Sequence, residues 1–570
     1  MFVIEEIEKY LESVFKKLDF ASENLSVTFS NRPELCQFQC NSSFALSKIL
    51  KKSPLEIATT ICNECNHENY VFAPCAPGFI NISLTEKCLN EIFKKLSESD
   101  NILVDKEVTP KTIVLDYGGP NVAKPLHVGH LRSAIIGETL KRLAKFMGNK
   151  VIADVHLGDW GLQMGLTIAG IMEKFNVDYY FKHQGEKPNI TMDNLNTIYP
   201  EASARSKEDE AFKKKAQDLT TRLQHKEVGI YDIWKDIRKI SVNAMLDEYK
   251  KLNVSFDLLN GESDCETYVS KVFEILNEKG LIEKSEGAEI VRVAKEDESK
   301  PMPPVIVKSS AGADLYATTE IATVLQRTTE FAPDEIWYVT DDRQTMHFEQ
   351  VFRVCALSEI SKNTKLCYLP FGTINGTDGK PFKTRAGGVM RLSDLIDMVT
   401  NASNNKLKEN HEEGNLELAR AIGVSALKFG DMINYRGKDY VLDIDKFCSF
   451  DGKTGPYLLY SLVRINSILS KAQGFETNFE LNSDISKEIL LNVVKLSNDI
   501  ALSYKEKSPN IMCQSAYVLA SSFSTLYANE NILQEKNEQK RNSLLTLLKL
   551  VSKSLNIVCN LLAIDVPNKM

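Results

Sequence analysis

The sequence predicts an α/β protein built on a parallel sheet, with an α+β segment before it and an all-α segment after it. Three observations support this fold class. A β-branched run at 112–115 is followed by a loop, a helical pattern and a second apolar run at 151–155. This strand, helix and strand within about 45 residues indicate a βαβ crossover. The first hundred residues mix helical periodicity with a strand pattern, and the pattern from about residue 396 onward predicts helices throughout.

The composition limits the classes of function. A chain of 570 residues is long enough for three or more domains, and 43% hydrophobic with 26% charged residues is typical of a soluble globular protein. The net charge of −8 means that any nucleic-acid binding must use local basic patches, which disfavours a DNA-coating role. The start of the chain has no signal-peptide pattern, and lysines interrupt the apolar stretch 544–562. We expect a cytoplasmic protein with no membrane segment.

The cysteine pattern leaves two interpretations open. The chain has 12 scattered cysteines, which suits reduced thiols in a cytosol. Cys36, Cys40, Cys62 and Cys65 are close in sequence and could hold zinc, but Cys62 and Cys65 follow a run that predicts a helix, and the upstream C-x3-C spacing is unusual for a zinc site. We expect packed thiols and no structural metal.

The first 105 residues predict a separate α+β unit. An opening helix has one apolar face formed by Ile4, Ile7, Leu11, Val14 and Leu18. A second helix should begin with Ser53 as its cap and Pro54 in its first turn. A turn and a strand at 75–83 end the unit.

The loop between the first strand and its helix has the chemistry of a nucleotide site. His127 and His130 lie three residues apart where the helix begins, so their rings can share one face. The amides of a helix N-terminus attract phosphate, and Gly129 has no Cβ to keep a flat ring away. Gly148 stands where the C-cap of this helix is expected. The alternative is a surface loop that happens to contain two histidines.

Two stretches carry a resemblance to a known family. Residues 120–133, Pro-Asn-Val-Ala-Lys-Pro-Leu-His-Val-Gly-His-Leu-Arg-Ser, resemble the HIGH signature of class I aminoacyl-tRNA synthetases. The Ala-Lys before the histidines, the Leu-Arg-Ser after them and Gly158-Asp-Trp-Gly161 resemble the arginyl-tRNA synthetases in particular.

The resemblance implies a three-domain enzyme. Residues 1–105 would contact tRNA, 106–395 would form a Rossmann-like catalytic domain with a helical insertion at about 175–255, and 396–570 would form a helical anticodon-binding domain. The implied substrates are ATP with Mg²⁺, L-arginine and arginine-specific tRNA. We expect a monomer.

A guanidinium group has five donors and no acceptor, so its pocket needs carboxylates and other oxygens. Asp116, at the end of the first strand, and Glu320 are candidate carboxylates, and Tyr316 lies four residues before Glu320 on one helical face. Each could instead be a solvated polar residue. The resemblance implies that arginine is bound by Asp116, Gly119, Pro120, Asn121, His130, Tyr316, Glu320 and Gln344. The family usually has Asp at the position of Glu320, so the reach of this carboxylate differs.

Residues 378–388 resemble a degenerate KMSKS loop, in which Pro381 and Thr384 stand at the usual lysine positions. Cations in a mobile loop suit a polyphosphate, although a basic surface turn is the alternative. The resemblance implies that Lys124 substitutes for the missing lysine. The predicted catalytic residues are His127, His130, Lys124 and Lys383, and the predicted ATP-binding residues are His127, Gly129, His130, Lys380, Lys383 and Arg385. A P-loop is disfavoured because Gly452-Lys-Thr lacks the upstream glycine.

In the C-terminal helices, Tyr457, Tyr460 and Arg464 are candidate tRNA contacts, because aromatic rings stack on bases and arginine binds phosphate. Aromatic residues at helical spacing are also typical of a core. Two rival functions stay open: another HIGH-bearing ligase, such as a glutamyl or cysteinyl enzyme, and a tRNA-binding paralogue without activity.

Overall fold

The computed structural model describes residues 2–23, 25–310, 315–382, 390–409, 415–472 and 474–570, and it divides into two compact units. The terminal unit comprises Met1–Lys106, Ser449–Leu561 and Asp565–Met570, and the central unit comprises Glu107–Cys448 and Leu562–Ile564. The domain borders predicted at 105/106 and 395/396 stay predictions, because compactness alone does not assign a function to a segment.

The first part of the terminal unit is an α+β domain. Its elements are α1 (Phe2–Lys17), β1 (Val27–Phe29), β2 (Phe38–Cys40), α2 (Ser42–Leu50), α3 (Pro54–Glu64), β3 (Tyr70–Cys75), β4 (Phe79–Leu84) and α4 (Glu86–Glu98). The four strands form an antiparallel sheet in the order β1-β2-β4-β3. The predicted start of α3 is confirmed: the Ser53 hydroxyl accepts a hydrogen bond from the Glu56 amide at 3.1 Å, and Pro54 occupies the first turn.

The second part of the terminal unit is helical. It contains α17 (Gly455–Lys471), α18 (Asp484–Lys505), α19 (Asn510–Asn529), a 3₁₀ turn η2 (Ile532–Gln534) and α20 (Glu538–Leu561). Among the described residues, α20 alone is long and apolar enough to cross a membrane, but 72% of its most apolar window is buried in the structure. This is the pattern of a core helix, and α20 packs on α17, α18 and α19.

The central unit is organised on a sheet with the order β11-β10-β5-β6. Its elements up to the insertion are β5 (Thr112–Tyr117), α5 (Val128–Phe146), β6 (Lys150–Asp154), α6 (Leu162–Lys174), α7 (Asp178–Lys182), α8 (Met192–Glu208), α9 (Glu210–Gln224) and α10 (Ile230–Lys251). Then come α11 (Glu266–Glu278), β7 (Ile282–Ser285), β8 (Ala288–Val291), β9 (Val305–Lys308), α12 (Tyr316–Phe331), β10 (Glu335–Val339), η1 (Asp342–Gln344), α13 (Thr345–Leu357), β11 (Lys365–Tyr368), β12 (Ile374–Asn375), α14 (Leu392–Glu409), α15 (Leu416–Met432), β13 (Tyr440–Val441) and α16 (Ile444–Phe447).

The predicted βαβ crossover is confirmed. β5 pairs in parallel with β6 on one side and with β10 on the other, and β10 pairs in parallel with β11. Every residue of β10 is buried, as expected for a strand covered on both faces. Gly148 follows α5 with φ +95°, the left-handed conformation that ends many helices.

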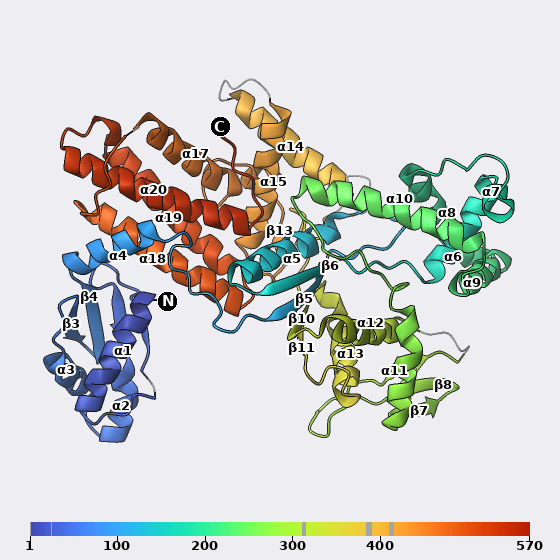
Figure 1. Cartoon of the computed structure of the whole chain (residues 1–570), viewed down its shortest axis with the longest axis horizontal. Coiled ribbons are helices and arrows are strands. Elements are labelled where there is room, and N and C mark those ends of the chain that lie inside the picture. The colour runs from blue at the N-terminus through green and yellow to red at the C-terminus, as the bar shows by residue number, and fades with distance from the viewer. Residues whose placement is uncertain (1, 24, 311–314, 383–389, 410–414, 473) are drawn as a thin grey trace. The chain divides into compact units, whose positions relative to one another are not determined.

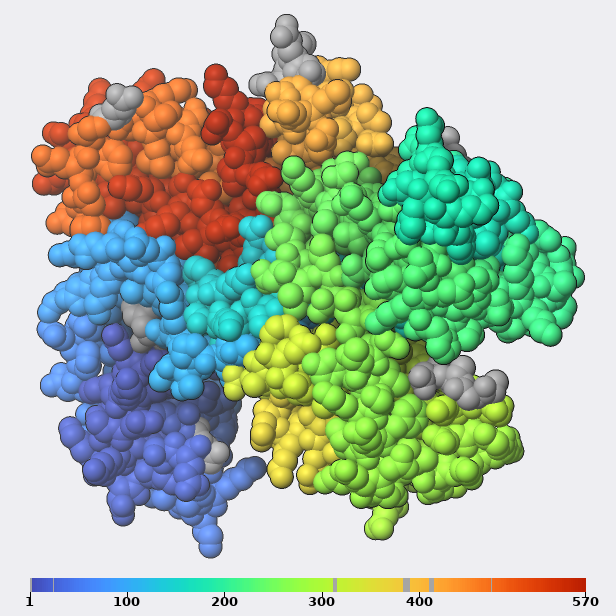
Figure 2. Space-filling view, turned by 45° about the vertical axis from the view of Figure 1, so that its right-hand side comes forward, coloured from blue at the N-terminus to red at the C-terminus, as the bar shows by residue number. Residues whose placement is uncertain are grey.

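The insertion between β6 and β7 is helical, as predicted. Helices α6, α8 and α9 pack on one another, and α10 contacts all three. Figure 1 shows α10 extending from this group toward the strands of the central sheet. In Figure 2 the insertion forms one continuous surface, coloured teal to green.

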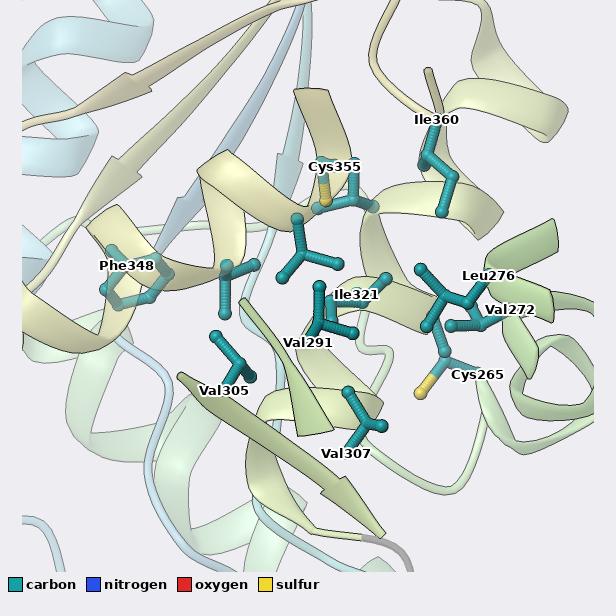
Figure 3. Close-up of a cluster of buried hydrophobic side chains, with 14 of the residues drawn as sticks. Cys265, Val272, Leu276, Val291, Val305, Val307, Ile321, Phe348, Cys355 and Ile360 are labelled. Carbon is teal, nitrogen blue, oxygen red and sulfur yellow. The ribbon is translucent and has the colours of Figure 1, made fainter. Parts of the chain in front are cut away.

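A buried apolar cluster supports the helix that carries Tyr316 and Glu320. Figure 3 shows Val272 and Leu276 of α11, Val305 of β9 and Ile321 of α12 packed together. Phe348 of α13 belongs to the same cluster. Because such cores are close-packed, α12 is held firmly against the small β7-β8-β9 sheet.

One expectation is contradicted, and another stays a prediction. The prediction of helices throughout from residue 396 is wrong at β13, because Tyr440 and Val441 pair in parallel with β12. In the cysteine group, burial raises the pKa of Cys62 and of Cys65 to about 12. None of the described residues form a group of three or more His, Cys, Asp or Glu that could hold a metal ion.

Candidate active site

A cavity of about 450 Å³ lies at the carboxyl ends of β5 and β10. This is the edge of a parallel sheet at which ligands are expected to bind. Its wall contains nine of the residues predicted from the sequence: Asp116, Gly119, Asn121, His127, Gly129, His130, Tyr316, Glu320 and Gln344. The structure therefore brings together segments of the chain that are more than two hundred residues apart.

The two histidines form one side of the cavity, with their ring centroids 4.0 Å apart. The Nδ1 atom of His127 accepts a hydrogen bond from the Gly129 amide at 3.0 Å, and the Nδ1 atom of His130 accepts one from the His127 amide at 3.0 Å. A neutral ring that accepts at Nδ1 carries its proton on Nε2. Both imidazoles thus keep an Nε2–H donor for a ligand.

The protonation state of the pair follows from its surroundings. Burial, followed by the charge of His127, lowers the pKa of His130 to about 3. Burial and the nearby Lys124 also lower the pKa of His127. Both rings are therefore neutral donors at neutral pH, which suits them to phosphate oxygens without adding charge.

Gly129 makes room for the ring of His127, and not only for the ring of a ligand as expected. A Cβ at this position would lie 2.8 Å from Cε1 of His127, which is closer than real Cβ contacts. The missing side chain therefore leaves room for the His127 imidazole to fold back over the first turn of α5.

The cavity wall also carries acidic residues. Tyr316 and Glu320 lie in the first turns of α12, and Glu320 is 3% exposed. Burial is the main cause that raises the pKa of Tyr316. The Tyr316 ring stacks on His347 with centroids 4.5 Å apart. Gln344, at the end of η1, lines the exposed rim.

Asp116 already has an ion-pair partner within the protein. Its Oδ2 atom lies 2.7 Å from Nη2 of Arg327, which also contacts Oδ2 of Asp154 at 2.8 Å. Burial raises the pKa of Asp116 although Arg327 opposes the shift. Part of the Asp116 charge is thus balanced inside the protein, which leaves Glu320 as the predicted carboxylate without such a partner among the described residues.

Sequence reasoning missed three residues of this region: Arg327, His156 and Glu262. Arg327 lies eleven residues after Tyr316 and seven after Glu320, on the same face of α12, so helical spacing was a usable signal. His156 and Glu262 line the cavity. Neither ring nitrogen of His156 has a hydrogen-bond partner among the described residues, and its φ of +34° is unusual for a residue with a Cβ.

Glu262 adds a third carboxyl group to the cavity, beside Asp116 and Glu320. Burial raises its pKa to about 7, with His156 acting in the opposite direction. No Lys or Arg forms an ion pair with Glu262 in the part of the chain that the structure describes. A cavity with such carboxyl groups is stabilised by an incoming cation.

Of the predicted cations of the degenerate loop, Lys380 lies within the described residues. Lys383 and Arg385 lie outside the described residues. Lys380 is exposed in a turn, where its amide donates to Oδ1 of Asp378 at 3.1 Å, and it is not in the cavity wall. Lys124 and Pro120 line a smaller neighbouring cavity instead, and the Lys124 ammonium lies 4.6 Å from the centroid of the Tyr199 ring.

The terminal unit carries an exposed aromatic group on α17 and α19. The Arg464 guanidinium lies 4.9 Å from the Tyr460 ring centroid and 4.5 Å from that of Tyr527. Tyr460 and Tyr527 are 36% and 40% exposed, so the group can offer a stacking surface. Tyr457 is half-buried, and its hydroxyl pairs with Ser524 at 2.9 Å, as in a core residue.

Three family models match the chain in order. The Arginyl tRNA synthetase N terminal domain matches residues 2–84, the catalytic domain of tRNA synthetases class I (R) matches 91–444, and the DALR anticodon binding domain matches 458–570.

Relatives and solved structures agree with these matches. The chain is 42% identical to an arginine–tRNA ligase of Alkaliphilus oremlandii over 100% of both chains, and 41% identical to one of Agathobacter rectalis over 99% of both. Its fold is similar to arginyl-tRNA synthetases of Plasmodium falciparum (TM-score 0.84, 23% identity, 100% of this chain and 99% of that one) and Thermus thermophilus (TM-score 0.81, 19% identity, 100% of both).

Proposed function

The chain belongs to the arginyl-tRNA synthetase family, and on that premise we propose that it ligates L-arginine to its tRNA through an arginyl-adenylate made from ATP, releasing AMP and pyrophosphate. The observation that carries the choice of amino acid is the acidic side of the cavity. Glu320, Glu262 and Asp116 line the same cavity as the two neutral histidine donors. A forked cation and a polyphosphate can therefore occupy one site together.

The first step is a displacement at phosphorus. An oxygen of the arginine carboxylate bonds to the α-phosphorus of ATP, and the bond from that phosphorus to the bridging oxygen of pyrophosphate breaks. The protein's part is to position the reactants and to stabilise charge. We assign the Nε2–H donors of His127 and His130 to the phosphate oxygens, and we assign Tyr316, Glu320 and Gln344 to arginine.

The second step transfers the arginyl group to a terminal ribose hydroxyl of tRNA, whose oxygen bonds to the carbonyl carbon as AMP leaves. We propose that Lys124, Lys380, Lys383 and Arg385 offset phosphate charge in the first step. Mg²⁺ would arrive with ATP and offset part of the charge of its phosphates.

Binding of tRNA would also use the terminal unit. We propose that Tyr460 and Arg464 contact tRNA, with Tyr527 completing the stacking surface. The half-buried position of Tyr457 supports a packing role for it more than a base contact. A cytoplasmic, monomeric enzyme fits this function.

The rival ligases fit the cavity less well. A glutamyl enzyme needs a cationic pocket where this cavity has carboxyl groups, and a cysteinyl enzyme needs zinc ligands around its substrate. A paralogue without activity would lack the histidine pair or the acidic residues, and this chain has both.

The decisive experiment measures aminoacylation of tRNA by each amino acid, and then the Glu320→Gln variant. We expect arginine to be the substrate and the variant to raise KM for arginine by on the order of 100-fold, because a buried charged contact is lost, with KM for ATP nearly unchanged. Glu330→Gln, an exposed carboxylate farther along α12, is the matched control and should behave as wild type. Preference for another amino acid, or an unchanged arginine KM in Glu320→Gln, would refute the assignment.

A further inference from the structure

The wall of the active-site cavity contains a single lysine or arginine among the described residues, and that residue is Arg343. Of the cations assigned to phosphate above, Lys124 lines the neighbouring cavity and Lys380 is outside this wall. None of the steps proposed above uses Arg343. Because ATP is strongly anionic, a guanidinium in this wall is a candidate contact for its phosphates.

Asp341 holds the guanidinium of Arg343 by one edge. Nε of Arg343 donates to Oδ1 of Asp341 at 2.6 Å, and Nη2 donates to Oδ2 at 2.7 Å. A guanidinium has five N–H donors, so three of them have no acceptor among the described residues. Two of these three form the Nη1–Nη2 edge, which is a second fork that matches two oxygens of a phosphate.

The turn that carries this ion pair is held by further hydrogen bonds. Asp341 caps η1, where its Oδ1 atom also accepts from the Arg343 amide at 3.0 Å, and its carbonyl oxygen accepts from the Tyr368 hydroxyl at 2.7 Å. The Asp342 amide donates to the Phe371 carbonyl oxygen at 3.1 Å. The guanidinium is therefore oriented before a ligand arrives, which is the arrangement that stabilises developing charge most effectively.

Arg343 lies at the mouth of the cavity. Its side chain is 80% exposed, whereas Glu320 and Asp116 are buried. Burial is the main cause that lowers the pKa of His127, and the charges of Lys124 and Arg343 add to it, so Arg343 also acts on the histidine pair. In the proposed first step, arginine lies at the buried carboxylates, and pyrophosphate is the part of ATP that returns to solvent.

We propose that Arg343 binds the β- and γ-phosphates of ATP through its Nη1–Nη2 edge, and that Asp341 is its positioning residue. This assignment rests on the proposed function. When the bond from the α-phosphorus to the bridging oxygen breaks, that oxygen takes the electron pair and leaves with pyrophosphate. A guanidinium already fixed at the pyrophosphate stabilises the charge that develops there.

The first test measures the arginylation kinetics of Arg343→Gln. We expect kcat/KM for ATP to fall on the order of 100-fold, because a charged contact to the leaving group is lost, with KM for arginine nearly unchanged. Arg343→Lys keeps the charge and loses the fork, so its kcat/KM for ATP should fall only about tenfold. Both variants should fold, because an exposed ion pair contributes little to stability.

Arg292→Gln is the matched control. Arg292 is also an exposed arginine paired with a carboxylate, since its Nε atom lies 2.8 Å from Oε2 of Glu283, but it is outside the cavity wall. This variant should have the kinetics of wild type. If Arg343→Gln has wild-type kinetics as well, the proposal is overturned.

The role of Asp341 is tested by a double-mutant cycle. Asp341→Asn should lower kcat/KM for ATP about tenfold, because asparagine still caps η1 but holds the guanidinium more weakly. The double variant with Arg343→Gln should be no worse than Arg343→Gln alone, since Asp341 acts through Arg343. Losses that add in the double variant would overturn the positioning role of Asp341.

Titration with inorganic pyrophosphate and with AMP identifies the part of ATP that Arg343 contacts. We expect Arg343→Gln to weaken pyrophosphate binding at least about tenfold and to leave AMP binding unchanged. Weaker binding of arginine with unchanged binding of pyrophosphate would place Arg343 at the arginine carboxylate and overturn the proposal. If no tRNA is arginylated while pyrophosphate binding depends on Arg343 as described, the proposed function fails and the phosphate contact of Arg343 stands.

Discussion

At the scale of single residues, Glu262 is the carboxyl group of the acidic cavity whose charge changes near neutral pH. Burial raises its pKa to about 7, so below that pH the empty site holds a neutral carboxylic acid. An arginine cation stabilises the ionised form and lowers this pKa. Binding then releases a proton wherever Glu262 is protonated beforehand, so arginine affinity rises as the pH rises through about 7 and levels off above it.

The expected size of this effect is about a tenfold gain in arginine affinity between pH 6 and pH 8, with up to one proton released per arginine bound at the lower pH. Calorimetric titration in buffers of different ionisation enthalpy measures both quantities. The Glu262→Gln variant should bind arginine more weakly and with little dependence on pH over the same range. If the wild-type affinity for arginine is the same from pH 6 to pH 8, the ionisation of Glu262 is not coupled to arginine binding.

The sequence predicts those site residues that are marked by a short spacing in the chain. His127, His130, Tyr316 and Glu320 come from short spacings at the starts of two helices, and all four line one cavity. Glu262 could not be found in this way. It lies on a loop with no periodic pattern, and a backbone bridge between Leu157 and Gly261 brings that loop to the cavity.

Arg327 and His156 were missed for a different reason. Arg327 shares a helical face with Tyr316 and Glu320, but arginines are mostly exposed, so spacing alone does not reveal that Arg327 is 2% exposed and bound to two aspartates. The position of His156 depends on a positive φ that the sequence does not reveal.

At the scale of elements, the close packing of α5 on β5 fixes the position of the histidines. Gly137 of α5 faces Tyr117 of β5, and a Cβ at Gly137 would lie 2.1 Å from Cγ of that ring. Tyr117 cannot easily move, because it is fully buried and its hydroxyl bonds to Glu138 and to the Ser255 carbonyl at 3.1 and 2.7 Å. The strand and the helix can approach closely only because residue 137 has no side chain.

We therefore expect Gly137→Ala to lower the free energy of unfolding by about 3 kcal/mol, because it overpacks a rigid contact. Urea unfolding followed by tryptophan fluorescence measures this in the relevant unit, since Trp160, Trp234 and Trp337 all belong to the central unit. Gly161→Ala is the control: no atom lies within 4 Å of its Cβ position, and the change should cost no more than about 1 kcal/mol. Equal stability of the two variants would contradict the packing argument.

Long elements with a clear hydrophobic pattern could be predicted from the sequence, and very short elements could not. The buried runs of β5, β6 and β10 and the amphipathic helices α1 and α20 follow from periodicity. The two-residue strand β13 does not, because its pairing with β12 is a tertiary contact made by Tyr440 and Val441 inside a helical region. Short strands of this kind have too few residues to carry a pattern of their own.

At the scale of the whole molecule, the terminal unit joins the two ends of the chain. The Lys553 ammonium of α20 donates to the carbonyl oxygens of Leu96, Ser97 and Ser99 at 3.0, 2.8 and 2.6 Å. These carbonyls belong to the last turn and C-cap of α4, where helix acceptors lack partners and the macrodipole favours a cation. One lysine therefore satisfies three orphan acceptors of a helix that is more than 450 residues away in sequence.

Replacing Lys553 by Met keeps most of the apolar stem and removes all three hydrogen bonds and the charge. We expect the C-terminal end of α4 to loosen, with a cost of about 2 to 3 kcal/mol, because three part-buried carbonyls lose their donor. Hydrogen exchange should speed up by about 30-fold or more at the amides of residues 96–104, while exchange within β5 of the central unit stays the same. Lys549→Met, an exposed position one turn earlier on α20, should leave both regions unchanged. Equal exchange at residues 96–104 in the two variants would mean that apolar packing between α4 and α20, and not Lys553, holds the first domain against the C-terminal helices.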